Sequence, residues 1–200
     1  MRLAYGLRNL RDVTRAMAER EAVAARERWP RERLEAFQRE RLGALVEHAS
    51  TYSPFYRAHY GGPIARADVR LEARPPVTKA MMMDRFDAFV TDPRLTRAAL
   101  ERNLASVGVR DELFLGEYRV MASGGSSGQK GIYVYDRAAW TAFLTGGMRW
   151  TSMMGVAPRL PRRRRLAQVA APDGKHMTSR GAASLSVGIF RSLRLSATQP

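Results

Sequence analysis

The feature of this sequence that most constrains its fold is a run of serine and glycine between two β patterns. Residues Ser123 to Gly131 read SGGSSGQKG. The preceding segment, Tyr118 to Ala122, reads as a strand, and the following segment, Ile132 to Tyr135, is β-branched and aromatic, as strands commonly are. The sequence therefore predicts two strands joined by a glycine-rich loop.

Helical patterns precede this unit. Apolar residues at steps of three and four predict one shared face on a first helix: Leu3, Leu7, Leu10, Val13 and Met17. Trp29-Pro30 is expected to end that helix, because proline disfavours the α conformation in the residue before it. A second helix is expected from Arg31, with the apolar face Leu34, Phe37, Leu42, Leu45, Val46 and Ala49. Ser53 and Thr78 are expected as N-caps of later helices.

After the loop the pattern alternates between helix and strand. Asp136 is expected to cap a helix that reaches about Met154, with one apolar side formed by Trp140, Phe143, Leu144 and Met148. Strands are expected at 166–171, 184–190 and 192–197. We therefore predict an α/β fold in which a mainly helical region, 1–105, and an incomplete α/β region, 106–200, belong to one large domain.

Composition narrows the classes of function. The chain has no cysteine, which excludes disulfides and thiolate metal sites, and its three histidines are far apart, so no metal site is predicted. No signal peptide and no apolar stretch long enough to span a membrane is found, which favours a cytoplasmic protein. The formal net charge is +15, which favours anionic partners such as nucleotides, CoA-like molecules, nucleic acid or a membrane surface.

The loop itself has the composition of a phosphate-binding site. Glycine lets the backbone approach a ligand closely, consecutive backbone N–H groups form an anion-binding concavity, and Lys130 adds a positive charge. The spacing is not that of a Walker A loop, because Lys130 stands five residues after Gly125, where that pattern needs glycine, and a strand follows instead of a helix. A flexible surface hairpin is the alternative interpretation.

Three ordered segments resemble the adenylate-forming superfamily, and most closely its phenylacetate–CoA ligase and CapK-like branch. Ser123 to Gly131 resembles the family's phosphate-loop signature, in which hydroxyl residues and glycines lead to a lysine. His48 to Tyr56 resembles an early helix junction that ends in Pro-Phe-Tyr, and Pro75 to Lys79 resembles a segment with proline and lysine at matching positions. Two departures occur in the loop: Gly124 replaces a hydroxyl residue, and Gln129 replaces a basic one.

The resemblance implies a ligase that activates a small carboxylic acid with ATP and Mg²⁺, forms an acyl-adenylate, and transfers the acyl group to CoA. It implies that this chain is the N-terminal portion of an adenylation domain and that it has no specific nucleic acid as a partner. It places phosphate-binding roles on Ser123, Gly124, Gly125, Ser126, Ser127, Gly128, Gln129 and Lys130. It also makes His176 a candidate for the border of the acyl pocket, although a loop histidine is more often solvated. No catalytic residue is assigned.

Later motifs of that family have no counterpart in these 200 residues. We therefore expect a C-terminal part or a separate subunit to complete the enzyme, and we expect the chain alone to be inactive. Two other interpretations stay open. One is a basic nucleic-acid-binding protein with a Gly-Ser hairpin, which the net charge and the run Arg162 to Arg165 suggest. The alternative interpretation of that arginine run is a solvated basic turn. The other is a non-catalytic remnant of the enzyme.

Overall fold

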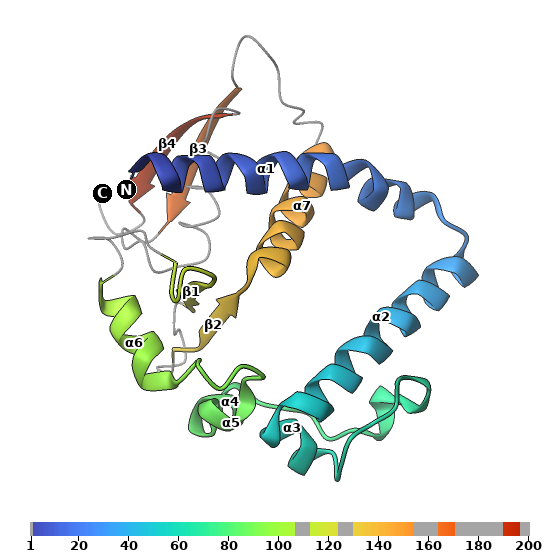
Figure 1. The fold of residues 1–200 in the computed structure, drawn as a ribbon. Helices are drawn as coiled ribbons and strands as arrows, with labels where there is room; N and C mark the ends of the chain where they lie inside the picture. The colour runs from blue at the N-terminus through green and yellow to red at the C-terminus, as the bar shows by residue number, and fades with distance from the viewer. Residues whose placement is uncertain (1, 107–112, 124–129, 154–163, 171–189, 197–200) are drawn as a thin grey trace. The chain divides into compact units, whose positions relative to one another are not determined.

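The computed structural model describes residues 2–106, 113–123, 130–153, 164–170 and 190–196 (Figure 1). Its contacts divide the chain into two compact units. The first comprises Met1–Glu27 and Arg102–Pro200, and the second comprises Arg28–Glu101. Helices dominate the described residues, with two small two-stranded sheets, so a mixed α/β class holds at this coarse level. None of the helices in these residues has the length and apolar character needed to cross a membrane.

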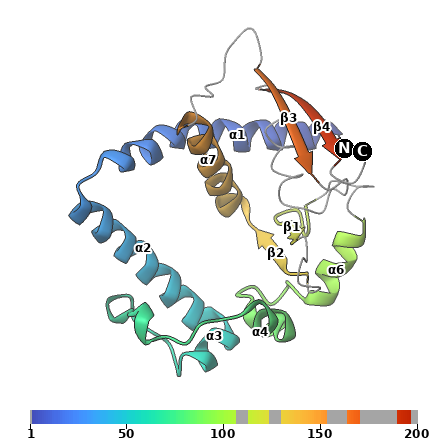
Figure 2. The ribbon, with the colours of Figure 1, turned by 180° about the vertical axis from the view of Figure 1, so that it is seen from behind.

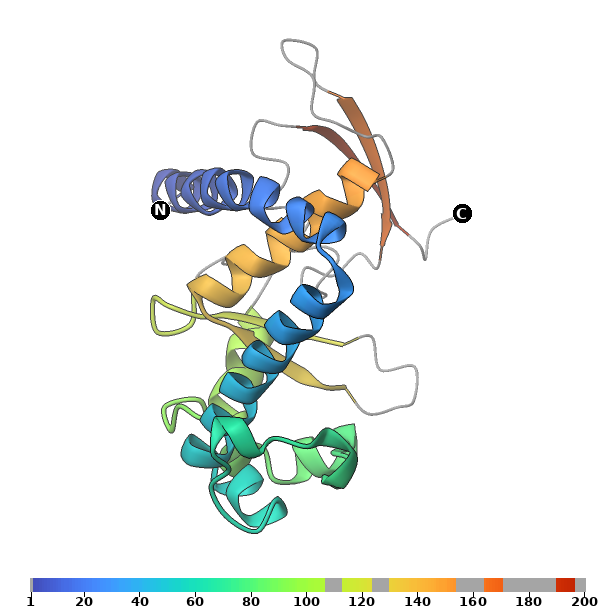
Figure 3. The ribbon, with the colours of Figure 1, turned by 90° about the vertical axis from the view of Figure 1, so that its right-hand side faces the viewer.

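The first unit contains the predicted strand–loop–strand arrangement. Strands β1 (Arg119–Ala122) and β2 (Ile132–Tyr135) pair antiparallel, from Arg119 opposite Tyr135 to Ala122 opposite Ile132. Figure 3 shows β2 continuing directly into helix α7. The two strands predicted on either side of the loop are thus confirmed.

Helix α7 (Arg137–Met153) begins as expected. The backbone N–H of Ala139 donates to Asp136 Oδ1 at 2.7 Å, which is the N-cap arrangement. The predicted apolar side of α7 is also confirmed, because it builds one core with α1 (Arg2–Ala25) and β1. That core comprises Val13, Ala16, Met121, Trp140, Leu144 and Met148, with Phe143 packed against it.

The face of α1 that packs on α7 differs from the predicted one. Val13 is buried, but Leu7 and Leu10 are 61% and 50% exposed, and Met17 is exposed as well. The buried positions beside Val13 are Asn9, Asp12 and Ala16, which recur at helical spacing. The helix is turned toward these residues because Asp12 finds a buried partner on β1, as described below.

Strands β3 (Arg164–Ala170) and β4 (Phe190–Ser196) form a parallel pair (Figure 2). The strand expected at 166–171 thus begins two residues earlier, and the candidate at 192–197 begins at Phe190. Of the candidate at 184–190, only Phe190 is described, and 184–189 lie outside the described residues. Val169, Leu193 and Leu195 are exposed on this pair, whereas parallel sheets are normally covered on both faces.

The second unit is helical. Its α-helices are α2 (Arg31–Tyr52), α3 (Pro54–His59), α4 (Lys79–Asp84), α5 (Phe86–Phe89) and the start of α6 (Arg97–Ser106), and its 3₁₀ turns are η2 (Arg66–Asp68) and η3 (Leu71–Ala73). A further 3₁₀ turn, η1 (Arg26–Arg28), lies just before Trp29-Pro30, where the first helix was expected to end. The buried apolar residues of this unit include Val46, Phe55, Ile64, Met82, Met83, Phe86, Leu95 and Leu100.

The predicted apolar face of α2 is confirmed in part. Val46 is buried and Leu34, Phe37, Leu42 and Ala49 are half-buried, but Leu45 is 65% exposed, and the buried residues Gly43 and Ser50 were not predicted. A Cβ atom on Gly43 would lie 2.8 Å from the backbone oxygen of Arg66, so this glycine permits close contact with η2. Ser50 Oγ accepts a hydrogen bond from the backbone N–H of Ile64 at 3.0 Å. Close backbone approach and hydrogen bonding therefore add Gly43 and Ser50 to the buried face that apolar periodicity predicts.

The two predicted N-caps in this unit are confirmed. Thr78 Oγ1 accepts from the backbone N–H of Met81, and Ser53 Oγ accepts from that of Tyr56, both at 3.2 Å. Ser53 does more than cap its helix, because its hydroxyl also donates to the backbone oxygen of Ala88 at 3.0 Å, which fixes α3 to the end of α5.

Ser53→Ala should therefore lower the free energy of unfolding of the second unit by about 1–3 kcal/mol, since it removes the cap and leaves a partly buried carbonyl without its donor. Urea unfolding followed by circular dichroism measures the change. Thr78→Ala is the matched control, because that cap is exposed and its hydroxyl makes no second hydrogen bond to any residue that the structure describes; a loss at Thr78 as large as at Ser53 would contradict this account.

Candidate functional site

The two ends of the predicted phosphate loop lie next to each other at the end of the β1–β2 hairpin. The backbone N–H of Ser123 donates to the backbone oxygen of Gly131 at 2.9 Å. In return, the backbone N–H of Gly131 donates to Ser123 Oγ at 2.8 Å. Ser123, predicted as a phosphate ligand, thus also closes the hairpin. Its hydroxyl accepts in this bond, so its proton can still be donated.

Lys130 and Gly131 have contrasting environments at this end of the hairpin. Lys130 is exposed, and Gly131 is buried. A Cβ atom at position 131 would lie 3.0 Å from the hydroxyl oxygen of Tyr133, so the absence of a side chain lets the Tyr133 ring cover the backbone. The residues between them in the candidate loop, Gly124, Gly125, Ser126, Ser127, Gly128 and Gln129, lie outside the described residues, as does His176.

The tyrosines of β2 bear on the electrostatics of the hairpin. Burial raises the pKa of the Tyr135 phenol above its ordinary value of 10.0, and the neighbouring Tyr133 raises it further. The phenol, which is neutral in the physiological range at its ordinary pKa, thus stays neutral to still higher pH.

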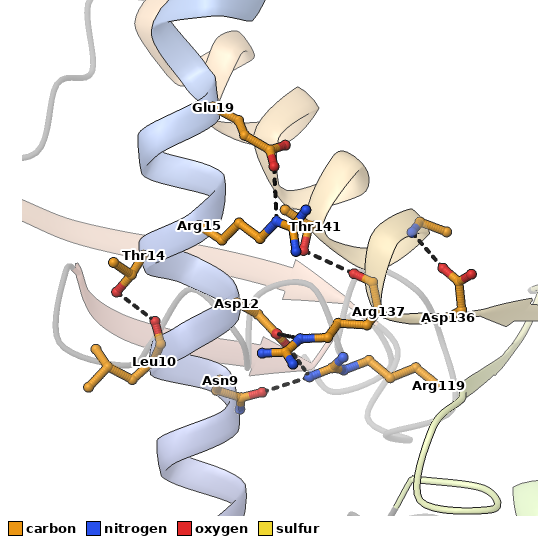
Figure 4. A network of polar contacts seen from close by, with 11 residues as sticks. Asn9, Leu10, Asp12, Thr14, Arg15, Glu19, Arg119, Asp136, Arg137 and Thr141 are labelled. Atoms are coloured by element: carbon orange, nitrogen blue, oxygen red, sulfur yellow. Dashed lines mark hydrogen bonds and ion pairs between the residues drawn. The ribbon is translucent and has the colours of Figure 1, made fainter. Parts of the chain in front are cut away.

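A buried ionic network holds the other end of the hairpin (Figure 4). Arg119 Nη2 donates to Asp12 Oδ2 at 2.8 Å and to Asn9 Oδ1 at 3.0 Å. Arg137 Nε donates to the second oxygen of the same carboxylate, Asp12 Oδ1, at 3.2 Å. The side chains of Arg119 and Asp12 are only 6% and 4% exposed. One carboxylate of α1 thus binds the first residue of β1 and the first residue of α7.

An aromatic ring completes the environment of Arg119. Its guanidinium carbon lies 4.8 Å from the ring centroid of Trp140, within the range of a cation–π contact. Trp140 is itself fully buried and stacks on Phe143, with centroids 5.0 Å apart. The guanidinium of Arg119 therefore has an ionic partner in Asp12 and a packed aromatic surface, and its position is tightly defined.

Other candidate residues are not drawn into a shared site. His48 is exposed and lies beside Tyr52, with ring centroids 4.8 Å apart. His59 Nε2 lies 3.2 Å from the backbone oxygen of Pro75. Across the described ranges, no three His, Cys, Asp or Glu side chains gather as a metal site would require. Of the arginine run, Arg162 and Arg163 lie outside the described residues, and Arg164 and Arg165 begin β3.

Sequence reasoning did not single out Asp12, Arg119 or Arg137. One signal was present, since Asp12 is the only acidic residue among the first 18 and is surrounded by arginines. That pattern indicates a paired carboxylate, but it does not identify a partner more than 100 residues away. Comparison of the chain with protein-family models, curated proteins and solved structures gives no match.

Asp12→Ala should destabilise the first unit by about 3–5 kcal/mol, because it leaves the Arg119 guanidinium buried without a counter-charge. Chemical unfolding followed by tryptophan fluorescence, to which the buried Trp140 contributes, measures this loss. Glu19→Ala is the control: it breaks the exposed pair between Arg15 and Glu19 on the same helix and should cost less than about 1 kcal/mol. Equal effects of the two substitutions would show that the buried network has no special role.

Proposed function

We propose that this chain supplies the phosphate-binding hairpin of an enzyme that activates a carboxylic acid with ATP, in the manner of the phenylacetate–CoA ligase and CapK-like branch of the adenylate-forming superfamily. The observation that carries the proposal is the closure of the hairpin at Ser123 and Gly131. The paired strands end where the serine- and glycine-rich sequence begins and resume where it ends. The sequence between the two strands therefore contains all of the residues that we propose to bind phosphate.

The chemistry of the loop supports a phosphate ligand. Phosphate oxygens need several hydrogen-bond donors within a small concavity, and glycine-rich backbone supplies them. The Ser123 hydroxyl proton and the exposed Lys130 ammonium group stand at the two ends of the loop. The hydroxyls of Ser126 and Ser127 are proposed to add further contacts, and Gly125 and Gly128 to allow close backbone approach.

The proposed reaction takes place at the α-phosphate of ATP. The carboxylate oxygen of the substrate attacks the α-phosphorus, the bond to the bridging oxygen breaks, and pyrophosphate leaves with the electron pair. The products are an acyl-adenylate and pyrophosphate. A thiol, proposed to be that of CoA, then attacks the acyl carbon and releases AMP. The loop would hold the β- and γ-phosphates, so that its contribution is positioning and stabilisation of charge.

The remaining parts of the proposed site come from other residues. Magnesium would be bound together with the nucleotide phosphates. His176 is retained as a candidate border of the acyl pocket, and adenine and ribose contacts are expected from residues beyond the hairpin. The alternative function, binding of nucleic acid by the basic chain, predicts affinity for duplex DNA that falls steeply with salt and is lowered by substitution of Arg162 to Arg165.

The test is nucleotide binding by the 200-residue chain. ATP with Mg²⁺ should raise the midpoint of thermal unfolding, and the double variant Lys130→Ala, Ser127→Ala should lower the affinity for ATP at least about tenfold, because each charge-assisted hydrogen bond contributes about 1.5–3 kcal/mol. Isothermal titration calorimetry measures the affinity.

Lys79→Ala is the control for the loss of a lysine charge, since Lys79 lies on α4 in the second unit, and it should leave ATP affinity unchanged. An ATP affinity insensitive to the loop substitutions would refute the phosphate-loop assignment. Tight, salt-dependent binding of random duplex DNA with no effect of ATP on stability would support the nucleic-acid alternative instead.

A further inference from the structure

A cavity lies at the end of the hairpin remote from the phosphate loop. Its volume is about 650 Å³, within the range of pockets that hold small organic ligands. Its walls come from α1, from the turn before β1, from the start of β1, and from the start of α7. The side chains that matter here are Arg8, Arg11, Asp12, Glu117, Arg119 and Arg137.

The charges around this cavity are incompletely matched, because four arginines and three acidic residues line it. Asp12 is shared by two guanidinium groups, those of Arg119 and Arg137, at 2.8 and 3.2 Å. One negative charge thus faces two positive charges in the wall. The acidic group at the start of α7, Asp136, uses Oδ1 to cap that helix, and Glu117 is exposed.

Arg8 and Arg11 add to the positive charge. Both line the cavity and are exposed, and neither has an ion pair with any residue in the described part of the chain. They stand three residues apart on α1, so their side chains are neighbours on the helix surface. Two adjacent guanidinium groups match the oxygen atoms of a phosphate or of a pair of carboxylates, to which arginine donates bidentate hydrogen bonds.

The cavity also has apolar walls and one unusual turn. Leu113 and Ala138 contribute apolar surface. The turn from Phe114 to Tyr118 follows Leu113 in the chain and is closed by two backbone hydrogen bonds of 2.9 Å. Leu115 in this turn has a φ of 53°, a left-handed conformation that is uncommon for a branched residue. A turn that supplies part of the cavity wall thus adopts an uncommon backbone conformation.

We propose that this cavity binds a small organic anion, with a phosphate or carboxylate headgroup held by Arg8 and Arg11 and an apolar body against Leu113 and Ala138. The site is distinct from the phosphate loop. Arg119, in the cavity wall, lies opposite Tyr135 in the strand register, whereas Ala122, beside the loop, lies opposite Ile132. The three residues of strand from Arg119 to Ala122 separate the cavity from the loop by about 10 Å. The proposal does not depend on the acid-activation function, and the bound anion would join α1 to the hairpin and to α7.

The test uses three probes at constant ionic strength: phenyl phosphate, phthalate and uncharged benzyl alcohol. Calorimetry on the full chain should show saturable binding, with one site per chain, for at least one of the two anions and none for benzyl alcohol. The double variant Arg8→Ala, Arg11→Ala should weaken that binding tenfold or more. Comparison of the two anions shows whether the headgroup is a phosphate or a carboxylate.

Two matched variants separate this site from the rest of α1 and from the phosphate loop. Arg15→Ala removes an arginine from the same helix that pairs with Glu19 and does not line the cavity, so it should leave the affinity unchanged. Lys130→Ala shows whether phenyl phosphate also binds at the phosphate loop; the binding that Arg8→Ala, Arg11→Ala removes should persist in this variant, because Lys130 lies at the opposite end of the hairpin. Absence of saturable anion binding, an equal loss in Arg15→Ala, or a loss of that same binding in Lys130→Ala would each overturn the proposal.

Discussion

The first unit depends on one buried carboxylate. Asp12 joins residues 107 and 125 positions away in the sequence, Arg119 and Arg137, and so connects α1 to both the hairpin and the helix that follows it. A buried ion pair adds little net stability, because desolvation offsets much of the attraction. Its effect is selective: any other rotation of α1 would leave Arg119 buried without a counter-charge. The pair thus decides that Asn9, Val13 and Ala16 share the packed face, although Leu7 and Leu10 would bury more apolar surface.

The β1–β2 hairpin is held at its two ends by different interactions. At Arg119 it is fixed by an ionic contact to α1 and by the ring of Trp140. At Ser123 and Gly131 it is closed by one backbone and one side-chain hydrogen bond. Between them, all four residues of β1 are buried. A loop that must position a reacting group needs anchors that do not move, and the rigidity of this hairpin is the structural argument for the proposed role of its loop.

Local features of the fold could be predicted from the sequence, and nonlocal ones could not. The caps formed by Ser53, Thr78 and Asp136 could be predicted, because each capping hydrogen bond joins residues only three positions apart in the sequence. Strands β1 and β2 could also be predicted, because β-branched and aromatic residues are common in strands. The face of α1 was predicted wrongly and that of α2 only in part, because apolar periodicity carries no information about a distant arginine or about the backbone of Arg66 that meets Gly43. For the candidate site, the sequence locates the loop, but the network at Asp12 becomes visible only once residues 12, 119 and 137 are close in space.

The same turns of α1 carry arginines in two different electrostatic situations. Arg15 is neutralised by Glu19 one turn later, at 3.0 Å on the open surface. Arg8 and Arg11 line a cavity in which four arginines meet three carboxylates and Asp12 is already shared between two guanidinium groups, so one positive charge is left unbalanced. Like charges gathered beside a partly apolar, low-dielectric wall repel each other more strongly than they would in water. Folding brings these groups together because Asp12 must reach Arg119, and the residual positive charge is a consequence of that packing. An anion in the cavity would balance this charge without disturbing the buried pair, since Arg119 and Arg137 occupy the two oxygens of Asp12 and leave Arg8 and Arg11 to bind the ligand.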